Sequence, residues 1–184
     1  MANRPPDYNV AHSYGLVSVH LNFFGTVPIP SFYDPEGYPT VVTITDSHAS
    51  PLSAAINSGR TEFTFTPTLF TQVGIHTLTV ELSDTDLVTS QTVTVTVLND
   101  APTFTVNTLQ NERMRVNKTM VITFNNFYDT EGNTIYMSFE EIEGWVATSL
   151  PVFATQSGSY QITFNPIPFS TLGVHTFKVI ISDS

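Results

Sequence analysis

Apolar and polar residues alternate along most of this chain, which is the pattern of β-strands with one face buried and the other in water. The alternation covers residues 17–23, 76–82, 93–97, 120–124, 135–139 and 175–181. Short clusters of Asp, Pro, Gly and Asn separate these segments and are typical of turns. No segment has a convincing helical period. The pattern therefore predicts an all-β protein built from short antiparallel strands.

An internal duplication organises the chain. The sequence FYDPEG at residues 32–37 recurs as FYDTEG at 127–132, and FTPTLFTQVGIHTLTVELSD at 65–84 recurs as FNPIPFSTLGVHTFKVIISD at 164–183. NRPP at 3–6 likewise corresponds to NDAP at 99–102. Three collinear matches indicate repeated structural units. We predict two tandem β-sandwiches, residues 1–100 and 101–184, with a short insertion in the second around residues 140–145.

The two copies end differently. The first continues through a Thr/Val strand to Asn99 and Asp100, whereas the second stops at residues 182–184. We therefore expect the second sandwich to lack its last strand, which would expose a hydrophobic groove and an unpaired sheet edge. Two explanations remain open: the sequence is a fragment of a longer array, or another chain supplies the strand, as in donor-strand complementation.

Composition narrows the range of functions. The formal net charge is −10 with only six basic residues, which argues against nucleic-acid binding because phosphate contacts need clustered Lys and Arg. The chain has no cysteine, so disulfides, zinc–thiolate sites and thiol catalysis are excluded. No apolar run reaches the ~20 residues that span a bilayer. The segment is therefore not expected to cross a membrane.

Three motifs carry a resemblance to a known family. LNDAPTF at 98–104 resembles the linker between cadherin repeats, DTE at 129–131 stands at the spacing of a cadherin Asp-x-Asp motif, and VIISD at 179–183 resembles a strand that ends in a calcium-binding Asp. The dystroglycan-type cadherin-like domain, with its Phe-x-Asp-Pro turn, is the closest variant. The resemblance implies immunoglobulin-like sandwiches from a larger extracellular or cell-surface repeat protein.

The resemblance also implies calcium at the junction of the modules. Its oxygen ligands would come from the linker and from loops of the second module: Asn99, Asp100, Asp129, Glu131 and Asp183. A matching partial site in the first module would consist of Asp34, Glu36 and Asp84. Residues 66–69, where a cadherin has an Asp-Arg-Glu motif, contain no carboxylate. The alternative is that these acids form turns and a stiff linker.

Other polar residues are weaker candidates. His76 and His175 occupy the position of a structural corner residue, and we expect hydrogen bonds there rather than metal binding. Asp46, Ser47 and His48 are triad residue types, but neighbours in sequence point apart and do not form a relay.

The insertion and a sequon carry further expectations. Glu140, Glu141 and Glu143 are expected in a solvated loop, with Trp145 capping the sandwich core or, alternatively, stacking on a sugar. Asn117 begins an N-glycosylation sequon.

These observations predict a function without catalysis, because no carboxylate pair, triad or nucleotide loop recurs in both copies. We expect a structural or adhesive module pair whose partners are neighbouring repeats of the same chain. The alternatives are a glycan- or protein-binding module that uses the loops around residues 140–145, and a filament subunit completed by a donated strand.

Overall fold

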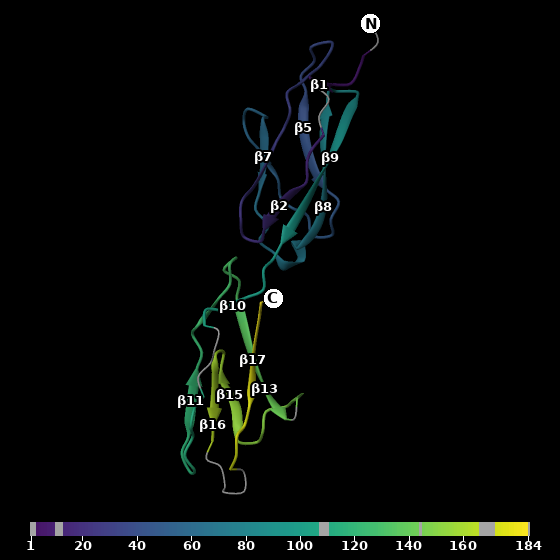
Figure 1. Ribbon diagram of the computed structural model, residues 1–184. Coiled ribbons are helices and arrows are strands. Elements are labelled where there is room, and N and C mark those ends of the chain that lie inside the picture. Colours follow the sequence, from purple (N-terminus) through teal and green to yellow (C-terminus); the bar gives the residue numbers. More distant parts are fainter. Residues whose placement is uncertain (1–2, 10–12, 107–110, 144, 166–171, 184) are drawn as a thin grey trace. The chain divides into compact units, whose positions relative to one another are not determined.

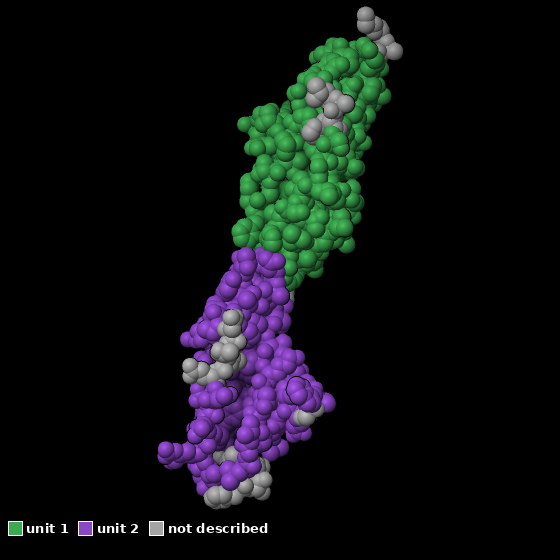
Figure 2. Space-filling view, viewed as in Figure 1, with its two compact units in different colours: residues 1–99 green, residues 100–184 purple. Residues whose placement is uncertain are grey.

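The computed structural model (Figure 1) describes residues 3–9, 13–106, 111–143, 145–165 and 172–183. The chain forms two compact units, Met1–Asn99 and Asp100–Ser184, drawn in green and purple in Figure 2. The unit boundary lies one residue before the predicted one. Within the described ranges every regular element is a strand except η1, one turn of 3-10 helix at Phe70–Gln72. Part of the second copy of the long repeat, residues 166–171, lies outside the described residues.

Two sheets form the first unit. One has the order β2 (Val17–His20), β9 (Val88–Leu98), β8 (Gly74–Ser83), β5 (Val41–Asp46), and the other has the order β3 (Gly25–Pro28), β7 (Glu62–Phe65), β6 (Ala55–Ile56). A short β1 (Asp7–Tyr8) pairs with β4 (Phe32–Tyr33). All neighbouring strands are antiparallel except β2 and β9, which are parallel.

The two sheets of the first unit enclose one core. Phe63 and Phe65 on β7 face Leu78 on β8 and Val95 on β9, and each of these side chains is at most 2% exposed. Threonines occupy the alternate positions of β9 on its outer face. Burial of one face of each sheet removes apolar surface from water, which is the main force that holds the sandwich together.

The second unit repeats this arrangement. Its sheets have the orders β11 (Met120–Thr123), β16 (Gln161–Phe164), β15 (Ala154–Gly158) and β14 (Val146–Thr148), β13 (Ile135–Glu143), β17 (Phe177–Asp183). A short β10 (Thr103–Phe104) pairs with β12 (Phe127–Tyr128). Met137 and Phe139 pack against Ile162 and Phe164 across the two sheets.

The predicted fold class is confirmed: both units are immunoglobulin-like β-sandwiches in tandem, antiparallel except for the β2–β9 pair of the first unit. As predicted, the second unit has no described counterpart of β9, so β17 pairs with β13 alone. Two details differ. The strand predicted over residues 17–23 ends at His20, because the chain turns at Asn22, which has φ 63°. The insertion is not a solvated loop but a hairpin in which β13 continues to Glu143 and pairs with β14.

Candidate functional site

The Asp34 carboxylate holds the turn after β4. Its Oδ1 accepts the N–H groups of Glu36 and Tyr38, both at 2.9 Å, and its carbonyl accepts the N–H of Gly37 at 3.1 Å. Gly37 has φ 82°, a conformation that favours glycine. Asp34 is therefore a turn-forming residue, as the alternative to a calcium ligand anticipated.

The repeated motif builds the same turn in the second unit. Asp129 Oδ1 accepts the N–H of Asn133 at 2.8 Å, the Asp129 carbonyl accepts the N–H of Gly132 at 3.3 Å, and Gly132 has φ 74°. Each aspartate uses only one carboxylate oxygen in this way. The second oxygen, Oδ2, is buried in both residues, and no described group donates to it.

Asp84 lies at the end of β8, beside the Asp34 turn. Its Oδ1 accepts the N–H groups of Asp86 and Leu87 at 2.7 Å each, and its Oδ2 accepts Nδ2 of Asn3 at 3.2 Å. These backbone N–H groups are the main reason that the pKa of the Asp84 carboxyl is lowered, and Asn3 and Asp34 contribute less. Asn3, Asp34 and Asp84 thus form an oxygen-rich cluster in the first unit.

Glu36 does not face this cluster. Its Oε1 lies 3.2 Å from Nε of Arg4, and its Oε2 accepts the backbone N–H of Arg4 at 3.3 Å. Of the predicted partial calcium site, the structure therefore brings Asp34 and Asp84 together, with Asn3 beside them. Glu36 instead forms an ion pair with Arg4.

In the second unit the structure joins two of the predicted ligands directly. Glu131 is 6% exposed, and its Oε1 accepts the backbone N–H of Asp100 at 3.3 Å. Asp129 is two residues before Glu131 in the same turn, and Asp183 ends β17 opposite Ile135. Asn99 belongs to the first unit.

Calcium prefers oxygen ligands, and both units offer them. The buried oxygens without a described donor include Asn3 Oδ1, Asp34 Oδ2 and Asp129 Oδ2. Carboxylate and amide oxygens of this kind suit a hard cation. They supply fewer than the six to eight oxygens that calcium takes, so water or other groups would complete the coordination.

A second cluster surrounds His76 on β8; the sequence predicted hydrogen bonds for this histidine but not its partner, Asp46. His76 is 0% exposed; its Nδ1 lies 2.6 Å from Oδ2 of Asp46 and its Nε2 lies 2.6 Å from the carbonyl oxygen of Gln72. Nδ1 thus lies beside a carboxylate oxygen and Nε2 beside a carbonyl oxygen. The expected structural, hydrogen-bonded role of His76 is confirmed.

Burial raises the pKa of the Asp46 carboxyl, but hydrogen bonds outweigh it. Leu52 N–H, at 2.7 Å, and His48 N–H, at 3.0 Å, donate to the carboxylate together with His76, so that its pKa lies below the usual value. Asp46 therefore stays charged beside the His76 ring.

The second unit repeats this contact with a different acid. His175 Nδ1 lies 2.7 Å from Oε1 of Glu141, which is 5% exposed. Asp46 and Glu141 each stand fourteen residues after the Phe of the FYD motif. That equal spacing is the sequence feature that could have identified Asp46 and Glu141 as corresponding residues of the two copies. We call the two contacts the acid–histidine pairs: Asp46 on β5 contacts His76 on β8, and Glu141 on β13 contacts His175, two residues before β17.

His48 does not form a relay with Asp46, as predicted. Its ring lies against the His76 ring, with centroids 4.2 Å apart, and its Nδ1 contacts the backbone of Ser50 at 3.0 and 3.1 Å. His76 is fully buried, so no substrate reaches the ring. The residue types of a triad are used here for packing and hydrogen bonding.

Trp145 lies in the turn between β13 and β14 and is 99% exposed, with φ 79°. The prediction that it caps the core is therefore wrong. Val146, next to it, is 63% exposed. The hairpin tip presents an aromatic ring and an aliphatic side chain to solvent.

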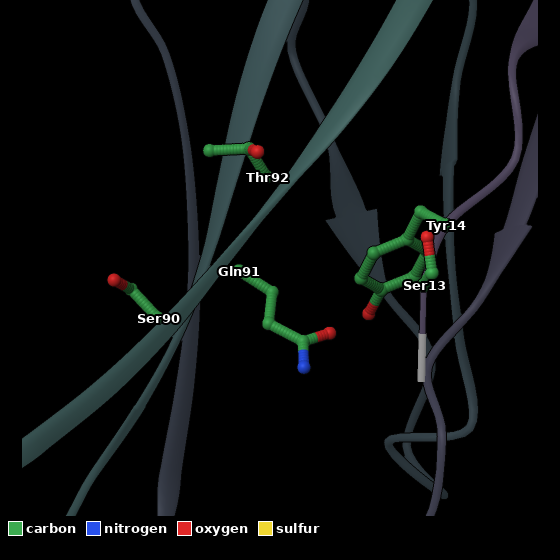
Figure 3. Close-up of a pocket in the computed structure, with 5 residues that line it drawn as sticks. All are labelled: Ser13, Tyr14, Ser90, Gln91 and Thr92. Atoms are coloured by element: carbon green, nitrogen blue, oxygen red, sulfur yellow. The ribbon is translucent and has the colours of Figure 1, made fainter. Parts of the chain in front are cut away.

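One open pocket of about 360 Å³ lies on the first unit between β9 and the segment before β2 (Figure 3). Ser90, Gln91 and Thr92 line one side, and Ser13 and Tyr14 line the other; the Gln91 amide points toward Tyr14. Burial raises the pKa of the Tyr14 phenol, and Tyr8 adds to the effect. The lining is polar and uncharged, with no acid, base or activated nucleophile among these five residues.

Asn117 is exposed and has φ 60°, in a turn closed by the Lys118 N–H and the Arg115 carbonyl. Its side chain is accessible, and glycosylation there stays a prediction. Among the described residues no helix has the length and apolar character needed to cross a membrane.

Comparison with known proteins finds similarity only among solved structures. No family model and no curated protein matches the sequence. The chain is similar to the titin domains Z1Z2 in complex with telethonin (14% identity, 100% of this chain and 92% of that chain, TM-score 0.47) and to immunoglobulin domains 1–4 of Sidekick-1 (15%, 97% and 45%, TM-score 0.40). It is also similar to the endo-fucoidan hydrolase MfFcnA4 of glycoside hydrolase family 107 (19%, 97%, TM-score 0.42), of which it spans about a quarter, 28%.

Proposed function

We propose that this chain is a non-catalytic structural or adhesive module pair of the cadherin-like kind, from a larger extracellular or cell-surface repeat protein. Its partners would be neighbouring repeats of the same chain. The observation that carries the proposal is that the polar residues repeated in both copies serve the fold: Asp34 and Asp129 form turns, and the acid–histidine pairs join strands.

The proposal that the pair is non-catalytic is supported by the places that the reactive residue types take among the described residues. His76 and Asp46 are buried and hydrogen-bonded to each other, and Glu141 is buried against His175. General acid–base chemistry needs groups that reach a substrate. The acidic surface and the small number of basic residues give no support to a nucleic-acid partner.

We further propose that calcium stiffens the modules through the Asp34–Asp84 cluster with Asn3, and through Asp100, Asp129, Glu131 and Asp183, with Asn99 contributing from the linker. The support is the buried oxygens of Asn3, Asp34 and Asp129 that lack a described donor, which suit a hard cation.

Thermal melting in calcium and in EDTA tests this proposal. For a site with the affinity of extracellular modules, ~10 mM calcium should stabilise the folded state by about 1–3 kcal/mol. D34N and D84N should reduce the difference between the two melting curves, whereas E36Q, which removes the partner of Arg4, should keep it. Identical curves for the unaltered chain in calcium and EDTA would refute calcium binding and leave the structural role standing.

A second candidate function is recognition of a glycan or protein by the β13–β14 hairpin. The observation in its favour is the 99% exposure of Trp145 at the hairpin tip, an element that the first unit lacks at the corresponding place in its described residues. A fully exposed aromatic ring gains free energy when it stacks on a partner.

A glycan array probed with the intact chain and with W145A tests this candidate. Loss of binding in W145A but not in Y136A, which removes a 54% exposed tyrosine from β13, would support it. Equal binding by W145A and the unaltered chain would exclude the hairpin as the contact.

A further inference from the structure

Half of the basic residues of this acidic chain lie in one short segment of the second unit. The chain has six Lys and Arg residues, and three of them are Arg113, Arg115 and Lys118. All three are exposed, in the segment that leads into β11 (Figure 1). We call these three residues the basic cluster. Because the net charge of the chain is −10, the basic cluster is a local reversal of sign on its surface.

The charges of the basic cluster are not neutralised within the part of the chain that the structure describes. Each of the other three basic side chains contacts an oxygen: Arg4 and Lys178 lie beside glutamates, and Arg60 donates to a backbone carbonyl. All 16 acidic residues of the chain lie in the described ranges, and no described ion pair joins any of them to the basic cluster. These three cations are therefore available to an anion from outside the chain.

The first unit builds the same turn without these charges. In both units an asparagine with positive φ, Asn22 (63°) or Asn117 (60°), lies in a turn that one backbone hydrogen bond closes, at 3.1 Å and 3.2 Å. The two asparagines have the same separation in sequence as the two FYD motifs. The positions of the basic cluster are occupied in the first unit by Ser18, His20 and Phe23. The turn therefore forms without Lys or Arg, and the fold does not require the basic cluster.

The basic cluster lines an open recess of about 240 Å³. Met114, Thr119 and Met120 complete the lining, and the two methionines pack against the core of the second unit. Met114 is partly buried between two exposed arginines, so it anchors the segment while both guanidinium groups stay at the surface. A guanidinium group can donate two parallel hydrogen bonds to an oxyanion. The recess thus combines three cations with a hydroxyl group at a site that is open to solvent.

We propose that the basic cluster binds the sulfate groups of a sulfated polysaccharide. Duplex DNA is usually held by about 6–10 phosphate contacts, and anionic membranes by clusters of about four to eight basic residues. Three cations on a chain of net charge −10 are too few for either. In a sulfated polysaccharide single charges stand on separate sugar units, so three cations can hold one or two sulfate groups. Such binding goes beyond the proposed function and depends on neither calcium nor the β13–β14 hairpin.

Binding of the intact chain to immobilised dextran sulfate, with unsulfated dextran as the reference surface, tests this proposal. The chain is produced without N-glycosylation, since a glycan on Asn117 would lie next to Lys118. We expect binding to dextran sulfate alone, with an affinity that decreases as the salt concentration rises. R113Q, R115Q and K118Q should each weaken binding about twofold to fivefold, and the triple variant at least about tenfold, as exposed ion pairs would.

K178Q is the matched control. It changes the net charge of the chain as K118Q does, but Lys178 lies beside Glu140 on β13 and outside the basic cluster. It should bind dextran sulfate as the unaltered chain does, and all variants should keep their melting temperature because the residues are exposed. Three results would overturn the proposal: no binding of the unaltered chain to dextran sulfate at low salt, equal weakening by K178Q and K118Q, or tighter binding to duplex DNA than to dextran sulfate. The last result would identify a nucleic acid as the partner.

Discussion

At the scale of single residues, the acid–histidine pairs explain why histidine occurs at the same place in both copies. The His76 ring lies between a carboxylate and a carbonyl oxygen, so two hydrogen bonds hold one end of β5 and the 3-10 turn against β8. Removing one member of a buried hydrogen-bonded pair leaves the other without its partner, which costs more than the hydrogen bond itself contributes.

The first prediction concerns the Asp46 carboxyl. Its pKa lies below the usual 3.8 in the folded state, so the unfolded chain takes up this proton at higher pH. The stabilisation is therefore complete above about pH 5 and decreases as the pH falls through 3.8 toward the lowered folded pKa. D46N should reduce the free energy of unfolding at pH 7 by about 1–3 kcal/mol, because the buried hydrogen bonds lose their charged acceptor, and it should flatten the pH dependence below pH 5.

Urea unfolding of the first unit between pH 3 and 7 measures this effect. Only part of the pH dependence should disappear in D46N, since the pKa of Asp84 is lowered as well. D86N, which changes an exposed carboxylate, serves as the control and should keep the full slope. A slope in D46N equal to that of the unaltered chain would contradict the assignment.

At the scale of elements, the β3–β7 pair shows that the two copies pack one equivalent pair of positions with different side chains. Gly25 on β3 pairs with Phe65 on β7, whereas the corresponding pair in the second unit is Met120 and Phe164. A Cβ placed on Gly25 would lie 2.6 Å from the Phe65 ring. The ring thus lies over the glycine, and this packing requires the missing side chain.

The second prediction follows from this contact. G25A should destabilise the first unit by about 1–3 kcal/mol, because the buried Phe65 ring would have to move within a packed core. Chemical denaturation measures the change. G15A is the matched control, since nothing lies within 4 Å of a Cβ at that position, and it should change stability by less than about 0.5 kcal/mol. Equal effects of the two variants would show that the Phe65 contact is not the cause.

At the scale of the whole molecule, each unit has a core of its own. The first contains strand residues that are completely buried on β7, β8 and β9, while the core of the second relies largely on partly buried residues. Less apolar surface removed from water means less stabilisation.

The third prediction is that the chain unfolds in two steps and that the second unit unfolds first. Hydrogen exchange followed by mass spectrometry at increasing urea would assign each step to peptides from residues 13–99 or 111–183. We expect the second unit to open at the lower urea concentration. One cooperative transition in which peptides from both units exchange together would contradict this prediction.

The local pattern of the sequence was sufficient to predict the fold class and the repeat. Alternation of period two predicted the strands, and the FYD motif with its glycine predicted both turns, because strand burial and turn conformation depend on residues close in sequence. The structural role of the two histidines was likewise predictable, since each copy places one at the same point of the repeated sequence, two residues after a glycine.

Contacts between distant residues were decided only by the tertiary structure. Asp46 and His76 are 30 residues apart, and nothing local to either indicates that they meet. Glu36 was predicted beside Asp34 but contacts Arg4, because the chain before β1 returns to this turn. Trp145 was expected in the core, yet the β13–β14 pairing carries it to a hairpin tip.

By itself, the sequence determined two β-sandwiches in tandem, because hydrophobic periodicity and duplication are properties of neighbouring residues. The tertiary structure decided which acid faces which histidine and which side chain the Glu36 carboxylate meets. Strand pairing brings residues from distant parts of the chain into contact, and burial in that setting determines whether a polar group serves the fold or a partner.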